Sequence, residues 1–213
     1  MNNIKEKFVV TAAQMRQIEE RIFTAGMPVP ALMEKVAGLV ARKILGSLNP
    51  NINQIGVLVG PGHNGGDALV IARELHFQGI EIRVYCPVAK LKELTNSHAK
   101  YIKHLGINFV ENISLLKNCA LLIDGLFGFG LEREISGDLA EVISQVNSWQ
   151  KQVFSIDLPS GIHTDTGEVL GTAICATHTF CLGLWKQAFL QDQALKYIGT
   201  SELIDFDLSL IHI

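Results

Sequence analysis

The residues with the clearest capacity for chemistry lie in a glycine-rich stretch, residues 60–67, with the sequence GPGHNGGD. An apolar run at residues 55–59 precedes it, and a helix-like run at residues 68–78 follows it and ends at Gly79. A strand, a glycine turn and a helix in this order present backbone N–H groups and a helix N-terminus to a phosphate. Glycine leaves room for a ligand to approach, and Asp67 is a candidate N-cap of the helix. The stretch therefore predicts an anion-binding turn.

Two further strand ends carry residues of a similar kind. One apolar run ends on Asp124 and leads into a second glycine loop, residues 125–131. Another apolar run ends on Asp157, and Ser160 follows it within an LPSG turn. In an open parallel sheet, ligands bind outside the carboxyl ends of the strands. Three such ends therefore indicate one shared site at one edge of a sheet.

The elements that must position these residues alternate between apolar strands and amphipathic helices. This alternation predicts an α/β fold, in which a mostly parallel sheet is covered by helices on both faces. Thr11 is a candidate N-cap of the first helix, which Gly26 interrupts. Further helices are expected at residues 30–45, 68–78, 91–105 and 139–149. Strands are expected at residues 55–59, 80–86, 107–110, 120–124 and 153–157, and near residues 173–182 and 202–206.

The bulk properties fit one compact domain spanning residues 1–213. The chain is 48% hydrophobic and 18% charged, and its net charge of −3 argues against a general nucleic-acid binder. No apolar run approaches the roughly 18 residues that cross a membrane, and residues 1–7 lead into no signal-peptide core. The four cysteines lack the spacing of a zinc site. Buried, reduced thiols in a cytoplasmic protein are expected.

A nicotinamide-dependent dehydrogenase is the first alternative to weigh, because Gly60, Gly62 and Gly65 match the pattern G-x-G-x-x-G. That motif also requires an acidic residue about 20 positions later, at the end of the next strand, to bind the adenosine ribose. Here the sequence Tyr-Cys-Pro, residues 85–87, occupies that place. A phosphate loop of the Gly-Lys-Ser/Thr type is absent, and Ser160 does not lie in a G-x-S-x-G elbow. The sequence therefore disfavours a standard dehydrogenase, a phosphate-loop protein and an enzyme with a serine nucleophile.

A cation site is a second possibility from the residues alone. Asn64, Asp124 and Ser160 offer hard oxygen ligands from three loops that should lie side by side. Such a donor set suits an alkali or alkaline-earth cation rather than a transition metal. The seven histidines are scattered along the chain, which argues against a transition-metal site.

The three loops together resemble a known family. Residues 57–67 (VLVGPGHNGGD), 123–130 (IDGLFGFG) and 155–161 (SIDLPSG) resemble the signature loops of the NAD(P)H-hydrate epimerases, the YjeF N-terminal domain family. Residues 11–15 and 32–38 resemble the family's opening helices. Residues 165–167 and 177–180, with Lys186 beyond them, resemble its closing strands. The resemblance spans nearly the whole chain in the right order.

The resemblance implies a three-layer αβα Rossmann-like sandwich, usually dimeric, that acts on NADH or NADPH carrying a hydroxyl on the ring carbon beside the nitrogen. It implies an isomerase that interconverts the R and S forms, so that an NAD(P)H-hydrate dehydratase can restore the cofactor. Asn64, Asp124 and Ser160 would bind potassium, and Asp157 would face the nicotinamide part. The other residues implied to hold the substrate are His63, Asn64, Gly65, Gly66, Asp67, Gly128, Phe129, Gly130, Leu131, Glu132, Arg133 and Glu134.

Asp157 is the candidate catalytic residue. The hydroxyl-bearing carbon is a hemiaminal, so the ring nitrogen can expel the hydroxyl once a general acid protonates it, and water can then add to the other face. Two positions depart from the family's usual sequence: His63 replaces an asparagine, and Ala68 replaces a glycine. The remaining alternative is a non-catalytic nucleotide-binding or dimerisation module of the same fold. No dehydratase domain is expected within the 213 residues.

Overall fold

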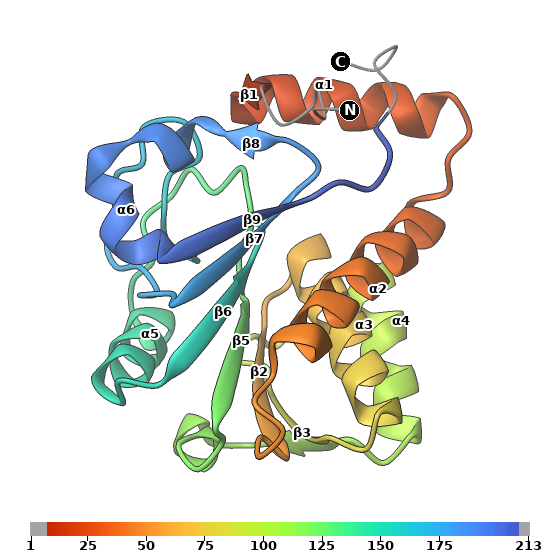
Figure 1. Ribbon diagram of the computed structural model, residues 1–213, viewed down its shortest axis with the longest axis vertical. Helices are drawn as coiled ribbons and strands as arrows, with labels where there is room; N and C mark the ends of the chain where they lie inside the picture. The colour runs from red at the N-terminus through yellow and green to blue at the C-terminus, as the bar shows by residue number, and fades with distance from the viewer. Residues whose placement is uncertain (1–7, 209–213) are drawn as a thin grey trace.

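A central parallel sheet organises the molecule (Figure 1). The computed structural model describes residues 8–208, so residues 1–7, where the sequence predicts no signal peptide, lie outside the described part. The seven strands follow the order β4-β3-β2-β5-β6-β7-β9, and every neighbouring pair is parallel. A separate two-stranded sheet pairs β1 with β8. The predicted α/β class with a mostly parallel sheet is confirmed.

The strands are β1 (Val9–Val10), β2 (Gln54–Val59), β3 (Glu81–Tyr85), β4 (Asn108–Val110), β5 (Leu121–Gly125), β6 (Gln152–Ile156), β7 (His178–Leu182), β8 (Trp185–Lys186) and β9 (Thr200–Ile204). The α-helices are α1 (Ala12–Thr24), α2 (Val29–Ser47), α3 (His63–Phe77), α4 (Glu93–His104), α5 (Asp138–Ser148) and α6 (Asp192–Ile198). Two short 3-10 helices are η2 (Ile113–Leu116) and η3 (Gln187–Leu190).

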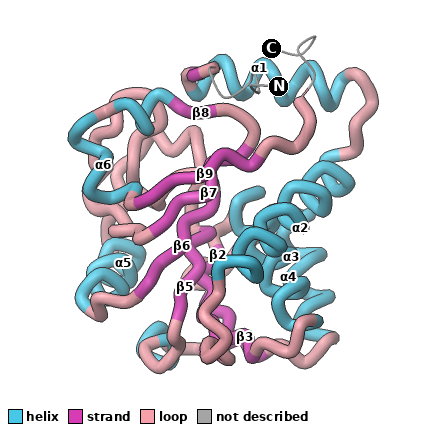
Figure 2. The backbone as a smooth tube through the Cα atoms, viewed as in Figure 1, coloured by secondary structure: helices cyan, strands magenta, loops and turns pink. Residues whose placement is uncertain are grey.

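Helices cover the sheet on both faces. In Figures 1 and 2, α2, α3 and α4 lie on one side of the strands and α5 lies on the other. Side chains that alternate along β2 show why: Val57 belongs to the apolar cluster shared with α2 and α3, whereas Leu58 belongs to the cluster shared with α5. A strand that is buried on both faces needs apolar residues at successive positions, as the sequence of β2 has.

The start of α3 differs from the prediction. The helix begins at His63 rather than at residue 68, and its N-cap is Gly62, which offers no side-chain cap. The prediction that Asp67 caps the helix is therefore wrong, because the glycine-rich residues themselves form the first turn and Asp67 lies within the helix. The predicted N-cap Thr11 is confirmed, since its hydroxyl accepts a hydrogen bond from the Gln14 N–H within a capping box.

The strand expected near residues 173–182 is shorter than predicted. Only β7 pairs in the sheet, because the backbone before it bonds elsewhere. The Ile174 N–H donates to the Ser160 carbonyl, and the Ala176 N–H donates to the Tyr197 carbonyl. These bonds tie the segment to the loop after β6 and to α6. The short helix α6 was not predicted either.

The sheet order places a ligand site at one defined point. The chain runs outward from β2 through β3 to β4, then returns to β5 on the other side of β2 and continues outward. The loops after β2 and β5 therefore leave in opposite directions, and such a switch point opens a crevice at the carboxyl ends of the strands. Among residues 8–208, none of the helices combines the length and apolar character that a membrane span requires.

Candidate active site

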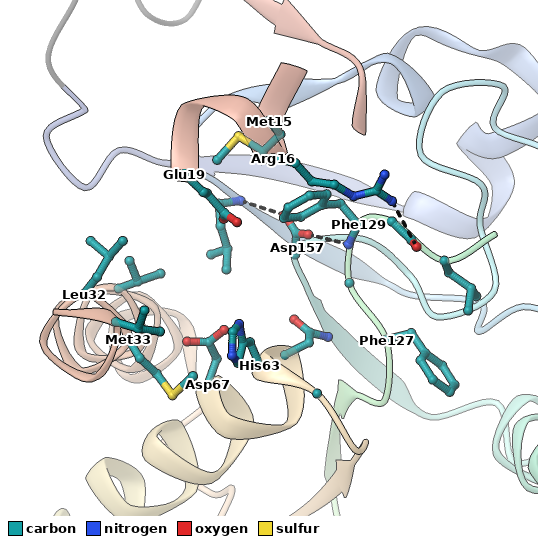
Figure 3. A pocket seen from close by; sticks show the side chains of 18 of the residues that line it. Met15, Arg16, Glu19, Leu32, Met33, His63, Asp67, Phe127, Phe129 and Asp157 are labelled. Carbon is teal, nitrogen blue, oxygen red and sulfur yellow. Dashed lines mark hydrogen bonds between the residues drawn. The ribbon is translucent and has the colours of Figure 1, made fainter. Parts of the chain in front are cut away.

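A cavity of about 410 Å³ opens at this switch point. Its walls come from α1, α2, the first turn of α3, the loops that follow β5 and β6, and β8. Figure 3 shows the side chains of Met15, Glu19, Met33, Asp67 and Asp157 gathered around it. The volume lies in the range of small-molecule and cofactor pockets. All three predicted strand ends contribute to this one cavity.

The glycines of the first loop are required by close backbone contacts. A Cβ at Gly60 would lie 1.7 Å from the Leu126 carbonyl oxygen, and one at Gly65 would lie 2.1 Å from the Gly60 carbonyl oxygen. The loops after β2 and β5 thus touch through their backbones. The first hydrogen bond of α3 runs from the Gly66 N–H to the Gly62 carbonyl at 3.2 Å. The preceding N–H groups of the helix are positioned to bind an anion.

Asp124 fastens the second loop to the third. Its carboxylate is fully buried and accepts hydrogen bonds from the Ser160 hydroxyl at 2.6 Å and from the Ser160 N–H at 2.9 Å. The Ser155 hydroxyl donates to it at 2.8 Å and the Leu126 N–H at 3.2 Å. Burial raises the pKa of Asp124, and the bonds from Ser160 and Ser155 oppose that rise. Four donors on one carboxylate make this junction rigid.

Asp157 adopts a left-handed backbone conformation, with φ of 69°, directly after β6. Few non-glycine residues adopt it, and such strain concentrates at functional sites. One carboxylate oxygen accepts from the Phe129 N–H at 2.7 Å, and the other accepts from Lys186 and from the Leu182 N–H at 3.4 Å. The conformation thereby aims the carboxylate at the loop after β5.

Lys186 is completely buried beside Asp157. Its ammonium also donates to the Leu182 carbonyl at 2.6 Å and lies 5.7 Å from the centre of the Phe129 ring. Burial disfavours the ammonium, but the Asp157 carboxylate outweighs it, so the pKa of Lys186 is raised. A lysine at this depth is stable only as part of an ion pair. Sequence reasoning noted Lys186 as a family position without giving it a role.

Two further carboxyl groups that line the cavity, one from α1 and one from α3, lack such partners. Asp67 is 9% exposed, and burial together with Asp157 and Glu19 raises its pKa well above the usual range. Glu19, on α1, was missed by sequence reasoning. Burial, and next the charge of Asp157, raises its pKa to about 7, while Lys186 acts in the other direction. Within the described chain, neither carboxylate has a hydrogen bond or ion pair that would offset its burial.

The three candidate potassium ligands are brought to one region. Asp124 and Ser160 are in direct contact, and a Cβ at Gly128 would lie 3.1 Å from Asn64 Oδ1 and 2.9 Å from Asp157 Oδ2. Asn64 Nδ2 is buried with no hydrogen-bond partner among the described residues. Rotating the Asn64 side-chain amide by half a turn would place Oδ1 at the position of Nδ2, where a cation could coordinate it. The oxygen donors therefore fit an alkali cation, and residues 8–208 contain no His/Cys/Asp/Glu cluster of the transition-metal type.

The predicted substrate-binding residues divide into two groups. Those on α3 and at the start of the second loop lie in or beside the cavity, and burial, then Lys92, lowers the pKa of His63 there. Residues 132–134 are exposed and lie outside the cavity lining. Glu132 instead forms an ion pair with Arg16 at 2.8 Å. The lining residues among those predicted are His63, Asn64, Asp67, Gly128, Phe129, Gly130, Leu131 and Asp157.

Comparisons with known proteins show the family of the chain and agree with its fold. Residues 29–188 match the family model described as YjeF-related protein N-terminus. The chain is 54% identical over 202 residues to a "Bifunctional NAD(P)H-hydrate repair enzyme Nnr" of Synechocystis sp., covering 94% of this chain and 38% of that protein. The chain thus spans about two-fifths of the length of such bifunctional relatives.

Shorter relatives match over nearly their full length. The chain is 38% identical over 193 residues to an "NAD(P)H-hydrate epimerase" of Limosilactobacillus fermentum, covering 89% of this chain and 92% of that protein. Among solved structures, the crystal structure of yeast ynu0, YNL200c, superposes with a TM-score of 0.79 at 20% identity, covering 86% of this chain and 83% of the yeast chain. That likeness supports the fold.

Proposed function

The chain belongs to the family of YjeF-related protein N-termini, and from that premise we propose that it is an NAD(P)H-hydrate epimerase. The substrate is hydrated NADH or NADPH, whose R and S forms the enzyme interconverts without a change of redox state. The observation that carries the proposal is the cavity at the switch point, which is lined by the glycine turn and the Asp157–Lys186 pair, while the Asp124–Ser160 junction holds the loop after β5 beside it. Relatives named NAD(P)H-hydrate epimerase match this chain over almost their whole length.

In this proposal the two glycine loops hold the dinucleotide. The first turn of α3, residues 63–67, directs backbone N–H groups and a positive helix end at the pyrophosphate. Residues 128–131 line the cavity beside it, and the exposed residues 132–134 contact the part of the dinucleotide that projects outward. The nicotinamide half enters the cavity toward Asp157.

Asp157 is proposed to exchange a proton with the hydroxyl or with the incoming water. The reacting carbon is bonded to both nitrogen and oxygen, so the ring nitrogen pushes the hydroxyl out as water when a proton reaches it. Water then adds to the other face and loses a proton to a base. Lys186 keeps the Asp157 carboxylate fixed at the cavity wall, so that the group does not have to reorganise during the reaction.

Asn64, Asp124 and Ser160 are the residues proposed to hold potassium. When bound, the ion would supply a fixed positive charge at the junction of the three loops, where no cationic side chain among residues 8–208 contacts the buried Asp124. The expected result is a melting temperature that rises with K⁺ at constant ionic strength and less with Li⁺. The Asp124→Asn variant should lose this difference. Equal melting temperatures in the two salts would contradict the assignment.

The setting of the reaction follows from the same proposal. We place residues 1–213 in a single epimerase domain that works as a homodimer in the cytoplasm, coupled to an NAD(P)H-hydrate dehydratase. Three of the relatives are named as bifunctional repair enzymes, which supports the coupling. The four described cysteines are free, as a reducing compartment allows. Gel filtration with light scattering tests the dimer.

One assay tests the activity itself. The R and S forms of hydrated NADH are separated, each is incubated with the protein, and the approach to equilibrium is followed by chromatography, with the uncatalysed rate subtracted. The expected result is faster equilibration with no oxidation or reduction, and a loss of about 10²–10⁴-fold in the Asp157→Asn variant. A folded wild-type protein that leaves the rate unchanged would instead support a non-catalytic module, and net redox chemistry would support a dehydrogenase.

A further inference from the structure

Among the described residues, three carboxyl groups line the cavity, but only one of the cationic side chains that line it is buried. Glu19, Asp67 and Asp157 all line it, whereas Lys186 is the buried cation that they share. The other basic lining residues, His63, Arg16 and Lys92, are exposed. Three ionised carboxylates around one cavity would repel one another, so the site favours keeping at least one of them protonated.

Glu19 differs from Asp157 in how its carboxyl group is held. Asp157 accepts hydrogen bonds from Lys186, Phe129 and Leu182, so both its oxygens are engaged. Glu19 has no hydrogen bond or ion pair recorded within residues 8–208. It extends from α1 into the cavity near Met15, as Figure 3 shows, and its carboxyl group is free to meet a ligand.

The position of Glu19 on α1 is set by packing of the same helix. Met15, Ile18 and Ile22 are buried and anchor α1 to the body of the protein. Glu19 lies one turn after Met15, so it falls on the border of this buried face and is turned to the cavity. The helix thereby presents the carboxyl group of Glu19 to the same cavity that Asp157 lines.

The burial of Glu19 and the charges that surround it keep a large fraction of its carboxyl groups protonated near neutral pH. Burial raises its pKa, Asp157 raises it further, and Lys186 lowers it, with a result of about 7. Asp67 faces the same space from α3, and its own pKa is raised in part by Glu19. Arg16, on α1 itself, is directed away to Glu132 and Gly130. Two carboxyl groups with different surroundings suit different roles in proton transfer.

We propose that Glu19 is a second catalytic acid/base group of the epimerase site, which donates the proton that releases the hydroxyl of the hydrated nicotinamide ring. The proposal rests on the function proposed above. The carboxyl proton of Glu19 passes to the hydroxyl oxygen, the carbon–oxygen bond breaks, and water leaves as the nitrogen lone pair forms a carbon–nitrogen double bond. Water then adds to the other face and gives its proton to Asp157, and transfer of a proton from Asp157 back to Glu19 restores the starting state.

The test compares Glu19→Gln with wild type and with Glu20→Gln, a matched variant at an exposed position of the same helix. The rates of R/S equilibration of hydrated NADH are measured from pH 5.5 to 8.5, and binding of NADP⁺ is measured by calorimetry. We expect Glu19→Gln to lose about 10²–10⁴-fold in kcat with NADP⁺ affinity unchanged, and Glu20→Gln to match wild type. Glu19→Asp, which keeps the proton but shortens the reach, should recover part of the rate.

The pH profile separates proton donation from a structural role. Because the protonated form is the active one, the wild-type rate should fall as the pH rises through about 7, and the residual rate of Glu19→Gln should not. An active wild type with a fully active Glu19→Gln variant overturns this inference alone. Loss of NADP⁺ binding together with activity in Glu19→Gln also overturns it, because it assigns Glu19 to binding. An inactive wild type overturns the proposed function and this inference together.

Discussion

The two sides of the cavity are built on different principles. The strand wall, defined here as Asp124, Asp157, Ser160 and Lys186, is a closed network in which each polar group meets a partner. The helix wall, defined as Glu19, Asn64 and Asp67, contains the unmatched groups: two carboxyls whose pKa burial raises and a buried amide nitrogen without a partner. Asp157 and Lys186 of the strand wall and all three residues of the helix wall line the cavity, whereas Asp124 and Ser160 support it indirectly, through the bond from the Phe127 N–H to the Ser160 hydroxyl.

This difference indicates which wall is complete before a ligand arrives. Buried polar groups are normally satisfied, and an unmatched one costs roughly 1–3 kcal/mol. The strand wall avoids that cost within the protein, so it can hold catalytic groups in fixed positions. The helix wall must be completed by a proton, a cation or the substrate. Binding therefore stabilises the helix wall more than the strand wall.

The largest effect is expected from breaking the strand wall at its buried cation. Lys186→Met leaves Asp157 buried without its cationic partner, which should lower the free energy of unfolding by about 3–5 kcal/mol. Urea denaturation followed by circular dichroism measures it, with Lys90→Met at an exposed position as the control. The double variant Lys186→Met/Asp157→Asn should recover part of the loss, since it removes the unpaired charge.

A loss no greater than that of Lys90→Met would mean that Lys186 does not secure the strand wall. A double variant as unstable as the single one would point to packing of the lysine side chain instead of its charge. Either result would mean that the charge pairing in the strand wall stabilises the protein less than its contacts indicate.

The next effect concerns the helix wall and depends on pH. Since the folded-state pKa of Glu19 is raised from 4.5 to about 7, its protonated form stabilises the fold. That contribution is complete below pH 4.5 and is lost as the pH rises through 7. Above pH 7, wild type must bury the ionised Glu19 carboxylate, whereas the Glu19→Gln variant has no charge at this position. The free energy of unfolding of the variant should therefore exceed that of wild type by up to about 3 kcal/mol, and solvent screening of the carboxylate reduces this difference. The two proteins should converge near pH 4.5.

Urea denaturation of both proteins at pH 4.5, 6 and 8 measures this difference, and Glu20→Gln serves as the control that should follow wild type. A constant offset between wild type and Glu19→Gln across the pH range would show that Glu19 is not the titrating group.

The two walls also differ in how well the sequence predicts them. Asp124, Asp157 and Ser160 follow apolar runs that can only be buried strands of a parallel sheet, and the carboxyl ends of such strands meet at one edge. Their convergence could therefore be predicted without any coordinates. The turn that contains Gly60 and Gly65 can likewise be predicted from the sequence, although the helix that follows it, α3, starts earlier than predicted.

Glu19 could not be predicted because its burial depends on how α1 crosses the cavity. Within its own helix it lies beside the buried Ile18 and resembles an ordinary charged residue at the border of an apolar face. Lys186 gave a similarly weak signal, since a lone lysine is usually solvated. Both residues owe their surroundings to contacts between segments far apart in the sequence, and a local pattern does not contain that information.

A smaller effect is expected when one hydrogen bond of the strand wall is removed. Ser160→Ala takes a donor from Asp124 and an acceptor from the Phe127 N–H, which should cost about 1–3 kcal/mol of stability. Ser148→Ala, at an exposed position where the hydroxyl donates only to the Gln145 carbonyl, should cost less than about 0.5 kcal/mol. Thermal denaturation of both variants measures the difference. A Ser160→Ala variant as stable as Ser148→Ala would remove the junction from the strand wall's network.

The smallest effect is expected at the surface ion pair that joins α1, which carries Glu19 of the helix wall, to the loop after β5. Arg16, on the helix that carries Glu19, pairs with Glu132 of the loop after β5, and their side chains are 49% and 71% exposed. An ion pair in this setting contributes about 0–1 kcal/mol and is screened by salt, so Arg16→Ala should be nearly neutral in urea denaturation at 0.5 M NaCl. A double-mutant cycle with Glu132→Ala measures the coupling. Coupling well above 1 kcal/mol would mean that the ion pair, rather than the apolar contacts of Met15 and Ile18, fixes α1 over the cavity. Glu19 would then owe its position to the loop after β5.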